Sequence, residues 1–252
     1  MDLEDQNVLV TGASRGIGRA AAEAFAEAGA RVAVHYGKSR SRAEELVGGL
    51  PGEGHYAVAA DLGDTVSVEA LAEGVVERFG RLHVLVNNAG IYEQHPPTEV
   101  SFDEWKEVWE RTLTVNLLGP AHLSFLLGLQ MAEQGGGRIV NVSSRGAFRG
   151  EPEAPAYGAS KAGLNALGQS LARALAPHGV SVCTVAPGWV ATDMARPHLQ
   201  GPEGEAIRTQ SPLGRVASPR EIARAILFLA EPGNEYLTGC ILDANGASYL
   251  RS

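Results

Sequence analysis

The chain has 252 residues, of which 44% are hydrophobic and 20% charged, and its formal net charge is -8. These values are typical of one globular domain spanning residues 1–252, and they leave no room for a long disordered tail. The acidic balance, without any cluster of Lys and Arg, argues against a nucleic-acid partner. The acidic start "MDLEDQ" lacks the features of a signal sequence, and no apolar run approaches membrane-spanning length. We therefore expect a cytoplasmic protein that does not bind a membrane.

Short β-branched runs alternate with longer alanine-rich segments of helical period. The predicted strands are residues 7–11, 31–36, 55–61, 82–88, 137–143, 180–186 and 240–244. The predicted helices are residues 16–28, 39–48, 64–79, 102–133 with a break near Pro120, 156–177 and 218–230, with Asp64 and Ser218 as N-caps. Because the strands read as nearly continuous apolar runs, they predict a parallel sheet covered on both faces. The expected fold class is therefore a doubly wound α/β domain with seven strands.

A glycine-rich loop, "TGASRGIG" at residues 11–18, joins the first predicted strand to the first helix. Gly12 permits a tight turn, and Gly16 and Gly18 let the backbone approach a pyrophosphate and the sheet. The N-terminus of the following helix offers free N–H groups and a positive dipole to phosphate. The pattern in this position indicates a dinucleotide site.

The segment "GASRG" within this loop also matches G-x-S-x-G, the nucleophile elbow of α/β-hydrolases, which would make Ser14 a nucleophile. That fold needs a strand and loop upstream to complete its oxyanion hole. Only one predicted strand precedes Ser14, so a hydrolase is the minor alternative.

The end of the second predicted strand, "VHYGKSRSR" at residues 34–42, indicates which dinucleotide binds. An NAD site normally places an acidic residue here, and none is present. The cations and hydroxyls available instead are Arg15, Lys38, Ser39, Arg40 and Arg42. They could bind a 2′-phosphate through charge-assisted hydrogen bonds, which predicts NADP(H) as the cofactor. Asp61, at the end of the third strand, fits a contact to the adenine edge.

The stretch "AYGASKAGL" at residues 156–164 places Tyr157 and Lys161 one helical turn apart on the same face. Taken alone, such a pair is most simply an ordinary solvated surface pair. A phenol beside an ammonium group, however, could also act as an acid, because the cation favours the phenolate and lowers the phenol pKa.

Taken together, the motifs resemble the short-chain dehydrogenase/reductase family from residue 7 to about residue 246. The matching segments are "TGASRGIG" (11–18), Asp61, "NNAG" (87–90), Asn116, "IVNVSS" (139–144), "YGASK" (157–161) and "PGWVATDM" (187–194). The resemblance implies a Rossmann-type sheet, a nicotinamide cofactor and a catalytic set of Asn116, Ser144, Tyr157 and Lys161.

Within that resemblance, Tyr157 would protonate the carbonyl oxygen while hydride reaches the carbon. Lys161 would lower the pKa of Tyr157 and hold the nicotinamide ribose, and Asn116 would keep a water chain for proton resupply. Ser144 would hydrogen-bond the substrate oxygen, whereas Ser143 is expected to be a structural residue at the strand end.

The same resemblance implies the full set of cofactor contacts. These are Gly12, Ser14, Arg15, Gly16, Ile17, Gly18, Lys38, Ser39, Asp61, Leu62, Asn88, Ala89, Gly90, Tyr157, Lys161, Pro187, Gly188, Val190 and Thr192. Residues 189–215 are rich in Pro, Gly and charge and are expected to form a lid over the substrate. Trp189 and Met194 are expected to pack rather than to line the pocket. No histidine pattern at ligand spacing is present, so no metal is expected.

The sequence is most similar within the family to 3-oxoacyl-[acyl-carrier-protein] reductases, which implies an acyl-thioester substrate. Two departures weaken that assignment: the segment "MAEQGGG" before Arg138 lacks the usual basic residues, and "DANGA" replaces the common "DGG". A reductase of a free small ketone, sugar or polyol is the alternative, and a non-catalytic NADP(H)-sensing protein is a remote one. The long helices of the family typically pair between subunits, which implies a homotetramer.

Overall fold

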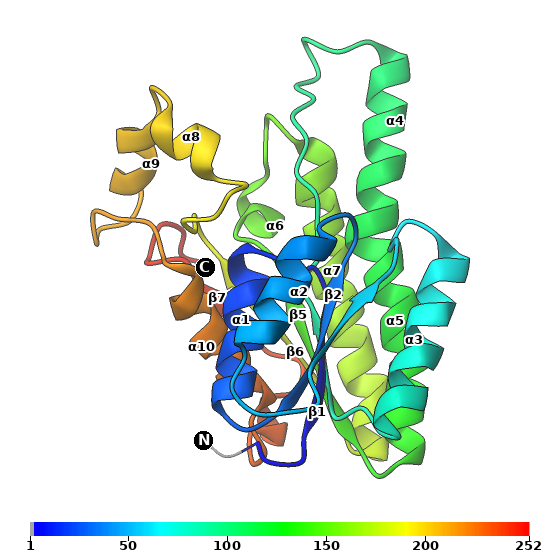
Figure 1. Ribbon diagram of the computed structural model, residues 1–252. Coiled ribbons are helices and arrows are strands. Elements are labelled where there is room, and N and C mark those ends of the chain that lie inside the picture. The colour runs from blue at the N-terminus through cyan, green and yellow to red at the C-terminus, as the bar shows by residue number, and fades with distance from the viewer. Residues whose placement is uncertain (1–2, 252) are drawn as a thin grey trace.

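The computed structural model describes residues 3–251 and is built on one seven-stranded parallel sheet (Figure 1). The strands are β1 (Asn7–Val10), β2 (Arg31–Tyr36), β3 (Tyr56–Ala59), β4 (Val84–Asn87), β5 (Gly137–Val142), β6 (Val180–Pro187) and β7 (Ile241–Ala244). Their order is β3-β2-β1-β4-β5-β6-β7, and every neighbouring pair is parallel. The predicted doubly wound fold is confirmed. The order reverses between β1 and β4, and ligands of such sheets bind outside the carboxyl ends of the strands at that point.

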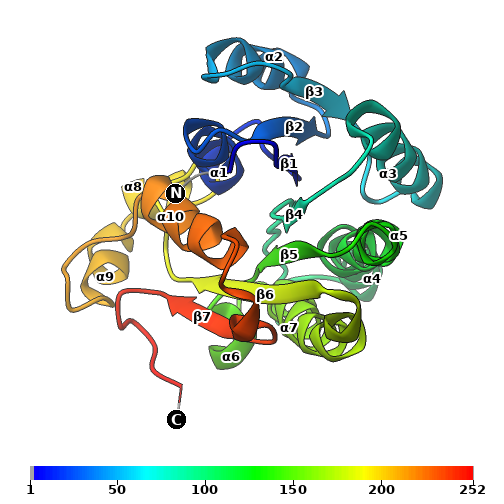
Figure 2. The ribbon, with the colours of Figure 1, turned by 90° about the horizontal axis from the view of Figure 1, so that it is seen from below.

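Helices cover both faces of the sheet. The longer ones are α1 (Gly16–Glu27), α2 (Arg40–Gly49), α3 (Thr65–Phe79), α4 (Phe102–Leu113), α5 (Gly119–Glu133), α7 (Pro155–Leu175) and α10 (Pro219–Ala230). Figure 2 shows α1, α2 and α10 on one face and α3, α5 and α7 on the other. Successive residues of a strand point to opposite faces, so Val8 and Val10 join one core cluster and Leu9 joins the other. Burial on both faces explains the apolar strand sequences.

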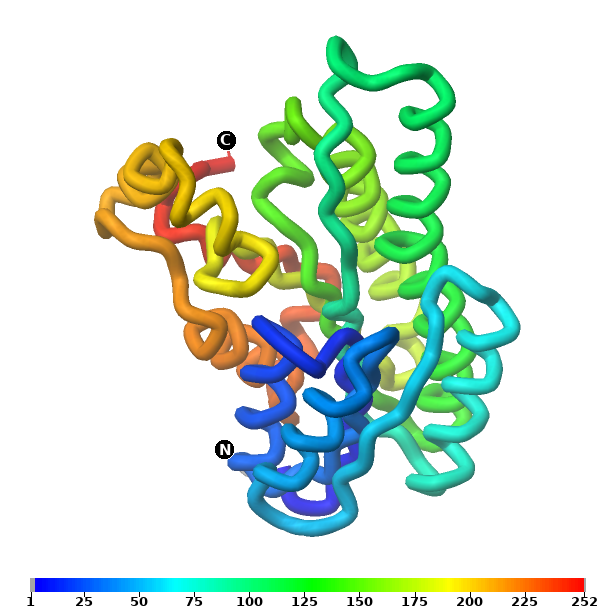
Figure 3. The backbone as a smooth tube through the Cα atoms, turned by 45° about the horizontal axis from the view of Figure 1, so that its top comes forward, coloured from blue at the N-terminus to red at the C-terminus, as the bar shows by residue number. Residues whose placement is uncertain are grey.

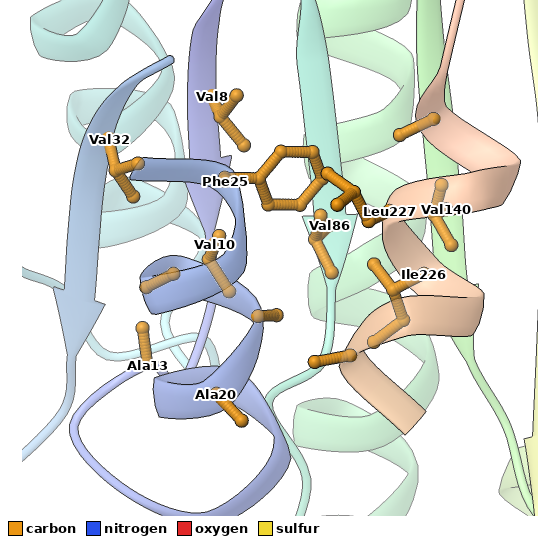
Figure 4. Close-up of a cluster of buried hydrophobic side chains, with 14 of the residues drawn as sticks. Val8, Val10, Ala13, Ala20, Phe25, Val32, Val86, Val140, Ile226 and Leu227 are labelled. Carbon is orange, nitrogen blue, oxygen red and sulfur yellow. The ribbon is translucent and has the colours of Figure 1, made fainter. Parts of the chain in front are cut away.

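The core between α1, α10 and the sheet shows how close this packing is (Figure 4). Phe25 of α1 lies fully buried beside Leu227 and Ile226 of α10. Small alanine side chains along α1, such as Ala21, let the helix backbone lie near the strands. The first turn of α1 is therefore held firmly above the carboxyl ends of β1 and β4.

The expected break near Pro120 is wrong, because the chain stays helical from α4 to α5. A π-helical turn, Thr114–Leu118, joins the two helices, and Pro120 lies in the first turn of α5. The proline lacks an N–H and its ring disfavours regular α-helix in the preceding turn, which is the turn that is π-helical here, so the helix continues through it.

This continuous helix, Phe102–Glu133, is long and apolar enough by length and composition to cross a membrane, which differs from the sequence-based expectation. Within its most apolar window, 44% is buried inside the protein. Core helices of soluble proteins have the same length and composition, and α5 packs against α3 and the sheet.

Two predicted helix starts are confirmed. The Asp64 carboxylate accepts hydrogen bonds from the first backbone N–H groups of α3, and Ser218 forms a capping box with Glu221 at α10. Three short helices were not expected: α6 (Gly146–Arg149), α8 (Arg196–Gln200) and α9 (Gly204–Thr209). The last two lie within the segment predicted as a lid, which Figure 3 shows in yellow and orange at the end of the molecule where α6 also lies.

Candidate active site

A cavity of about 830 Å³ opens at the carboxyl ends of the strands. The loops that follow β1 through β6 all contribute to its lining. Every residue predicted to contact the cofactor lines it, with the single exception of Gly18, which faces the loop after β4 from within α1. The structure therefore brings together residues that are far apart in the chain, as the motifs predicted.

The glycine loop is shaped for close approach of another group. Gly12 has φ +63° and Gly16 has φ +58°, both in the region that favours glycine. A Cβ atom on Gly18 would lie 2.4 Å from Nδ2 of Asn88, so only glycine fits there. The α1 N-terminus has no capping side-chain hydrogen bond and no acidic residue in its first turn. Its N–H groups are therefore available to an anion, which fits the pyrophosphate of a dinucleotide.

Two residues that the sequence reasoning missed hold this loop. The Thr11 hydroxyl accepts hydrogen bonds from the backbone N–H groups of Asn88 (2.9 Å) and Ala89 (3.0 Å). Nδ1 of His35 accepts the N–H of Gly12 (3.0 Å), and Nε2 donates to the Ala60 carbonyl (3.1 Å). Burial lowers the pKa of His35 to about 4, which keeps the ring neutral. A histidine inside the otherwise apolar strand "RVAVHY" was the available signal.

The cations near the expected 2′-phosphate site divide into two groups. Arg15, Lys38 and Ser39 line the cavity, and no ion pair engages Arg15 or Lys38 within residues 3–251. Arg40 instead pairs with Glu44 (2.8 Å) and Arg42 with Asp193 (3.1 Å), and neither arginine lines the cavity. Only the first group therefore lies on the cavity.

Asp61 lies on the cavity wall at the end of β3, as predicted. Its carboxylate accepts the backbone N–H of Gly63 at 2.8 Å, which fixes the side chain in place.

Tyr157 and Lys161 lie on the first turns of α7 and both line the cavity, together with Ser144 from the end of β5. The Ser144 hydroxyl hydrogen-bonds the phenol of Tyr157 and accepts the backbone N–H of Gly146 at 3.0 Å. Nζ of Lys161 donates to the carbonyl of Val142 at 2.9 Å and lies 5.8 Å from the centre of the Tyr157 ring.

The protonation of this pair differs from the expectation. Burial raises the pKa of Tyr157 to about 12, although the hydrogen bond from Ser144 lowers it. Burial lowers the pKa of Lys161 to about 8. The expected lowering of the Tyr157 pKa by Lys161 is therefore wrong for the protein by itself. Burial is the largest cause of both shifts, because it disfavours the charged form of each group.

Ser143 behaves as the structural residue that was expected. Its hydroxyl donates to the backbone carbonyl of Lys161 at 3.2 Å and so ties α7 to β5.

Asn116 is fully buried in the π-helical turn and does not line the cavity itself. Its amide accepts the backbone N–H of Ile91 (2.8 Å) and donates to the Ile91 carbonyl (2.9 Å) and to the Ser160 hydroxyl (3.2 Å). A Cβ atom on Gly90 would lie 3.3 Å from Oδ1 of Asn116 and 3.4 Å from Nζ of Lys161. The side chains of Asn116 and Lys161 therefore both lie close to Gly90.

His95, also missed by the sequence reasoning, caps the start of α7. Its Nε2 accepts the backbone N–H of Ala156 at 3.1 Å, and its Nδ1 donates to the Glu93 carbonyl at 2.8 Å. The ring is fully buried. It connects the loop after β4 to the turn that carries Tyr157.

Aromatic side chains surround the reactive end of the cavity. The Tyr92 ring contacts those of Tyr157 (centroids 5.1 Å apart) and His198 (5.9 Å), and Trp189 contacts His198 (5.4 Å). Trp189 and Met194 both line the cavity, so the expectation that they only pack is wrong. Sequence could not place them, because this wall is built from three separate segments: the loop after β4, the start of α7 and the segment after β6.

Comparison with known proteins agrees with the site. A family model described as enoyl-(acyl carrier protein) reductase matches residues 12–246. The chain belongs to the short-chain dehydrogenase/reductase family, whose members are oxidoreductases that use a nicotinamide cofactor.

Several curated proteins are similar over nearly their whole length. The 3-oxoacyl-[acyl-carrier-protein] reductase FabG of Vibrio cholerae is 39% identical, over 99% of this chain and 100% of its own. FabG of Staphylococcus aureus is 38% identical, over 97% of this chain and 98% of its own. The D-threitol dehydrogenase of Mycolicibacterium smegmatis is also 38% identical, over 99% of this chain and 95% of its own.

Proposed function

We propose that this protein reduces a ketone to a secondary alcohol with NADP(H). The observation that carries the proposal is the convergence of Ser144, Tyr157 and Lys161 on the cavity that the glycine loop also lines. A non-catalytic nucleotide sensor would not need this set.

The reaction consumes one ketone, one reduced cofactor and one proton. Residues of the glycine loop, with Arg15 and Lys38, would hold the cofactor, which when bound would provide the hydride for the carbonyl carbon. Tyr157, which like any phenol of pKa 10 or above is protonated at neutral pH, gives its proton to the carbonyl oxygen as negative charge develops there. Ser144 donates a hydrogen bond to the same oxygen, and the Lys161 ammonium stabilises the phenolate that forms. Asn116 holds the loop at Ile91 beside them.

The choice of NADP(H) over NAD(H) rests on charge. The loop after β2 contains no acidic residue, and Arg15 and Lys38 line the cavity without ion-pair partners in the described part of the chain. These cations would bind a 2′-phosphate, with Ser39 donating a further hydrogen bond.

The substrate to test first is a 3-oxoacyl thioester, since two of the relatives above are named as reductases of such compounds. A free polar ketone is the second candidate. The charged residues Arg145 and Glu151 line the cavity near Ser144, where a fatty acyl chain would gain nothing from them. Arg138, a candidate contact for an acidic carrier, pairs with Glu235 at 3.3 Å.

The direct test is a consumption assay of NADPH and NADH by the purified protein. Its substrates are acetoacetyl thioesters and a panel of free ketones, sugars and polyols. We expect NADPH to be consumed with at least one ketone, and NADH about tenfold or more less efficiently. Equal use of both cofactors would contradict the assignment of Arg15 and Lys38, and absence of any turnover would contradict the proposed reaction.

A further inference from the structure

The substrate side of the cavity contains a buried arginine that the reaction above does not use. Arg145 directly follows Ser144, is only 3% exposed and lines the cavity. Its backbone N–H donates to the Pro187 carbonyl at 2.9 Å, which joins the loop after β5 to the loop after β6. This bond fixes the backbone of Arg145 next to Ser144, whose hydroxyl would hold the substrate oxygen.

The guanidinium group of Arg145 is only partly satisfied. Nη2 donates to the side-chain oxygen of Gln210, and Nη1 is buried without a hydrogen-bond partner. The neighbouring carboxylate of Glu151 forms an ion pair with Arg149 at 3.8 Å, whereas no ion pair engages Arg145 among residues 3–251. Burial and the charge of Arg149 together lower the pKa of Arg145 to about 10, although the Glu151 carboxylate opposes the shift, so the group is still charged at neutral pH. The Glu151 carboxylate offsets part of this charge, but a buried guanidinium N–H without a hydrogen-bond partner among residues 3–251 is costly, and an anionic ligand bonded to it would remove that cost.

A second unsatisfied donor belongs to another residue that lines the cavity. Nε1 of Trp189 is buried without a partner, and Trp189 also lines the cavity, two residues after Pro187. A carboxylate has two acceptor oxygens and favours charge-assisted bonds with arginine. A neutral ester or a thioester offers only a carbonyl oxygen and no charge.

We infer that Arg145 and Trp189 form a subsite for a carboxylate on the substrate, so that the preferred substrate is a free oxo acid. The inference rests on the proposed ketone reduction and names its substrate class. Gln210 positions the guanidinium through Nη2. The acidic group of the substrate lies against Arg145 while its ketone oxygen lies against Ser144 and Tyr157.

The test compares acetoacetate with its ethyl ester and with an acetoacetyl thioester, all with NADPH. We expect the wild-type kcat/KM for acetoacetate to exceed that for the ester by about tenfold or more. Arg145→Gln should lower kcat/KM for acetoacetate by about tenfold to a hundredfold and change the value for the ester by less than about threefold. Trp189→Phe, which keeps the ring but removes the N–H, should lower the acetoacetate value by a smaller factor.

Arg196→Gln is the matched control. Arg196 belongs to the lid segment that also contains Trp189, pairs with Asp193 and does not line the cavity. Its replacement therefore removes one positive charge, as Arg145→Gln does, but from outside the cavity. Arg196→Gln should leave the ratio of kcat/KM for acetoacetate to kcat/KM for the ester unchanged. The dissociation constant of NADPH, unchanged in every variant, shows that each is folded. Should Arg145→Gln fail to fold, Trp189→Phe still gives the comparison.

A binding measurement without turnover distinguishes failure of this inference from failure of the proposed function. Calorimetry measures acetoacetate binding to the protein loaded with NADP⁺, where no turnover can occur. Binding that Arg145→Gln weakens by about tenfold supports the subsite even if no ketone is reduced. Ketone reduction with equal or better use of the ester or thioester, unchanged by Arg145→Gln, overturns the subsite and leaves the reductase. No binding and no turnover overturns both.

Discussion

At the scale of single residues, burial decides the protonation of the reactive pair. Tyr157 holds its proton firmly and Lys161 is a charged group kept in a place that disfavours charge. The sequence predicted both residues, since their spacing on a helix is local information. It did not predict their pKa values, because the two side chains are buried by loops that are distant in the sequence.

The buried ammonium group of Lys161 should destabilise the folded protein. Its pKa falls from 10.5 in the unfolded chain to about 8 in the folded protein, so the unfolded state binds the proton more tightly. Stability therefore rises with pH between about 8 and 10.5, and below pH 8 the full cost of about 3 kcal/mol is present. Lys161→Met, which also loses the hydrogen bond to Val142, should be about 2 kcal/mol more stable at pH 7 and inactive.

Urea unfolding of both proteins without cofactor, at pH 7 and near pH 10, checks this prediction. The difference should shrink at the higher pH. A variant that is less stable than the wild type at pH 7 would show that Lys161 is not strained by burial.

At the scale of elements, hydrogen bonds between distant segments position the site. Asn116 connects the π-helical turn to the loop after β4, and His95 connects that loop to α7. The sequence predicted the helices and two of their caps, because those signals are local. It predicted a break near Pro120 where the structure has the π-helical turn, since sequence alone does not show that Asn116 bonds to Ile91.

Asn116→Ala should weaken both stability and activity. The variant leaves the backbone N–H and carbonyl of Ile91 without partners in a partly buried place, at a cost of about 2 kcal/mol. Chemical denaturation gives the stability, and steady-state kinetics should show a lower kcat with a nearly unchanged KM for NADPH. Asn116→Ser, which keeps part of the hydrogen bonding, should have a stability and a kcat between those of the wild type and of Asn116→Ala. A fully active Asn116→Ala would show that Asn116 has no part in the mechanism.

The glycine loop should respond to the protonation of His35. Its pKa is lowered to about 4 in the folded protein, against 6.5 when unfolded, so stability is lost as pH falls between these values. The loss reaches about 3 kcal/mol, chiefly because burial disfavours the charged ring, and protonated Nδ1 also cannot accept the Gly12 N–H. Unfolding free energies of the wild type and His35→Phe should converge as the pH is lowered from 7 toward 4. Parallel pH curves would show that His35 does not hold the loop.

At the scale of the whole molecule, the sheet order and its two apolar faces follow from the sequence, and one surface suggests the assembly. Phe125 and Leu129 are one turn apart on α5, 60% and 45% exposed, and Leu118 is 46% exposed. We propose that this face pairs two copies of the chain within a homotetramer. Such exposed apolar patches commonly mark interfaces.

The double variant Phe125→Glu with Leu129→Glu should lower the mass measured by light scattering. Two charges at this face would have to be buried on association. Val66, exposed by 71% on α3, gives a control as Val66→Glu, which should leave the mass unchanged. An assembly that survives the double variant would place the interface elsewhere.

The central claim is that Tyr157 donates the proton that completes ketone reduction. The most direct measurement is NADPH consumption by Tyr157→Phe, with NADPH binding followed separately by fluorescence. We expect a loss of about 10³-fold in turnover with an unchanged dissociation constant for NADPH. Turnover equal to the wild type would contradict it.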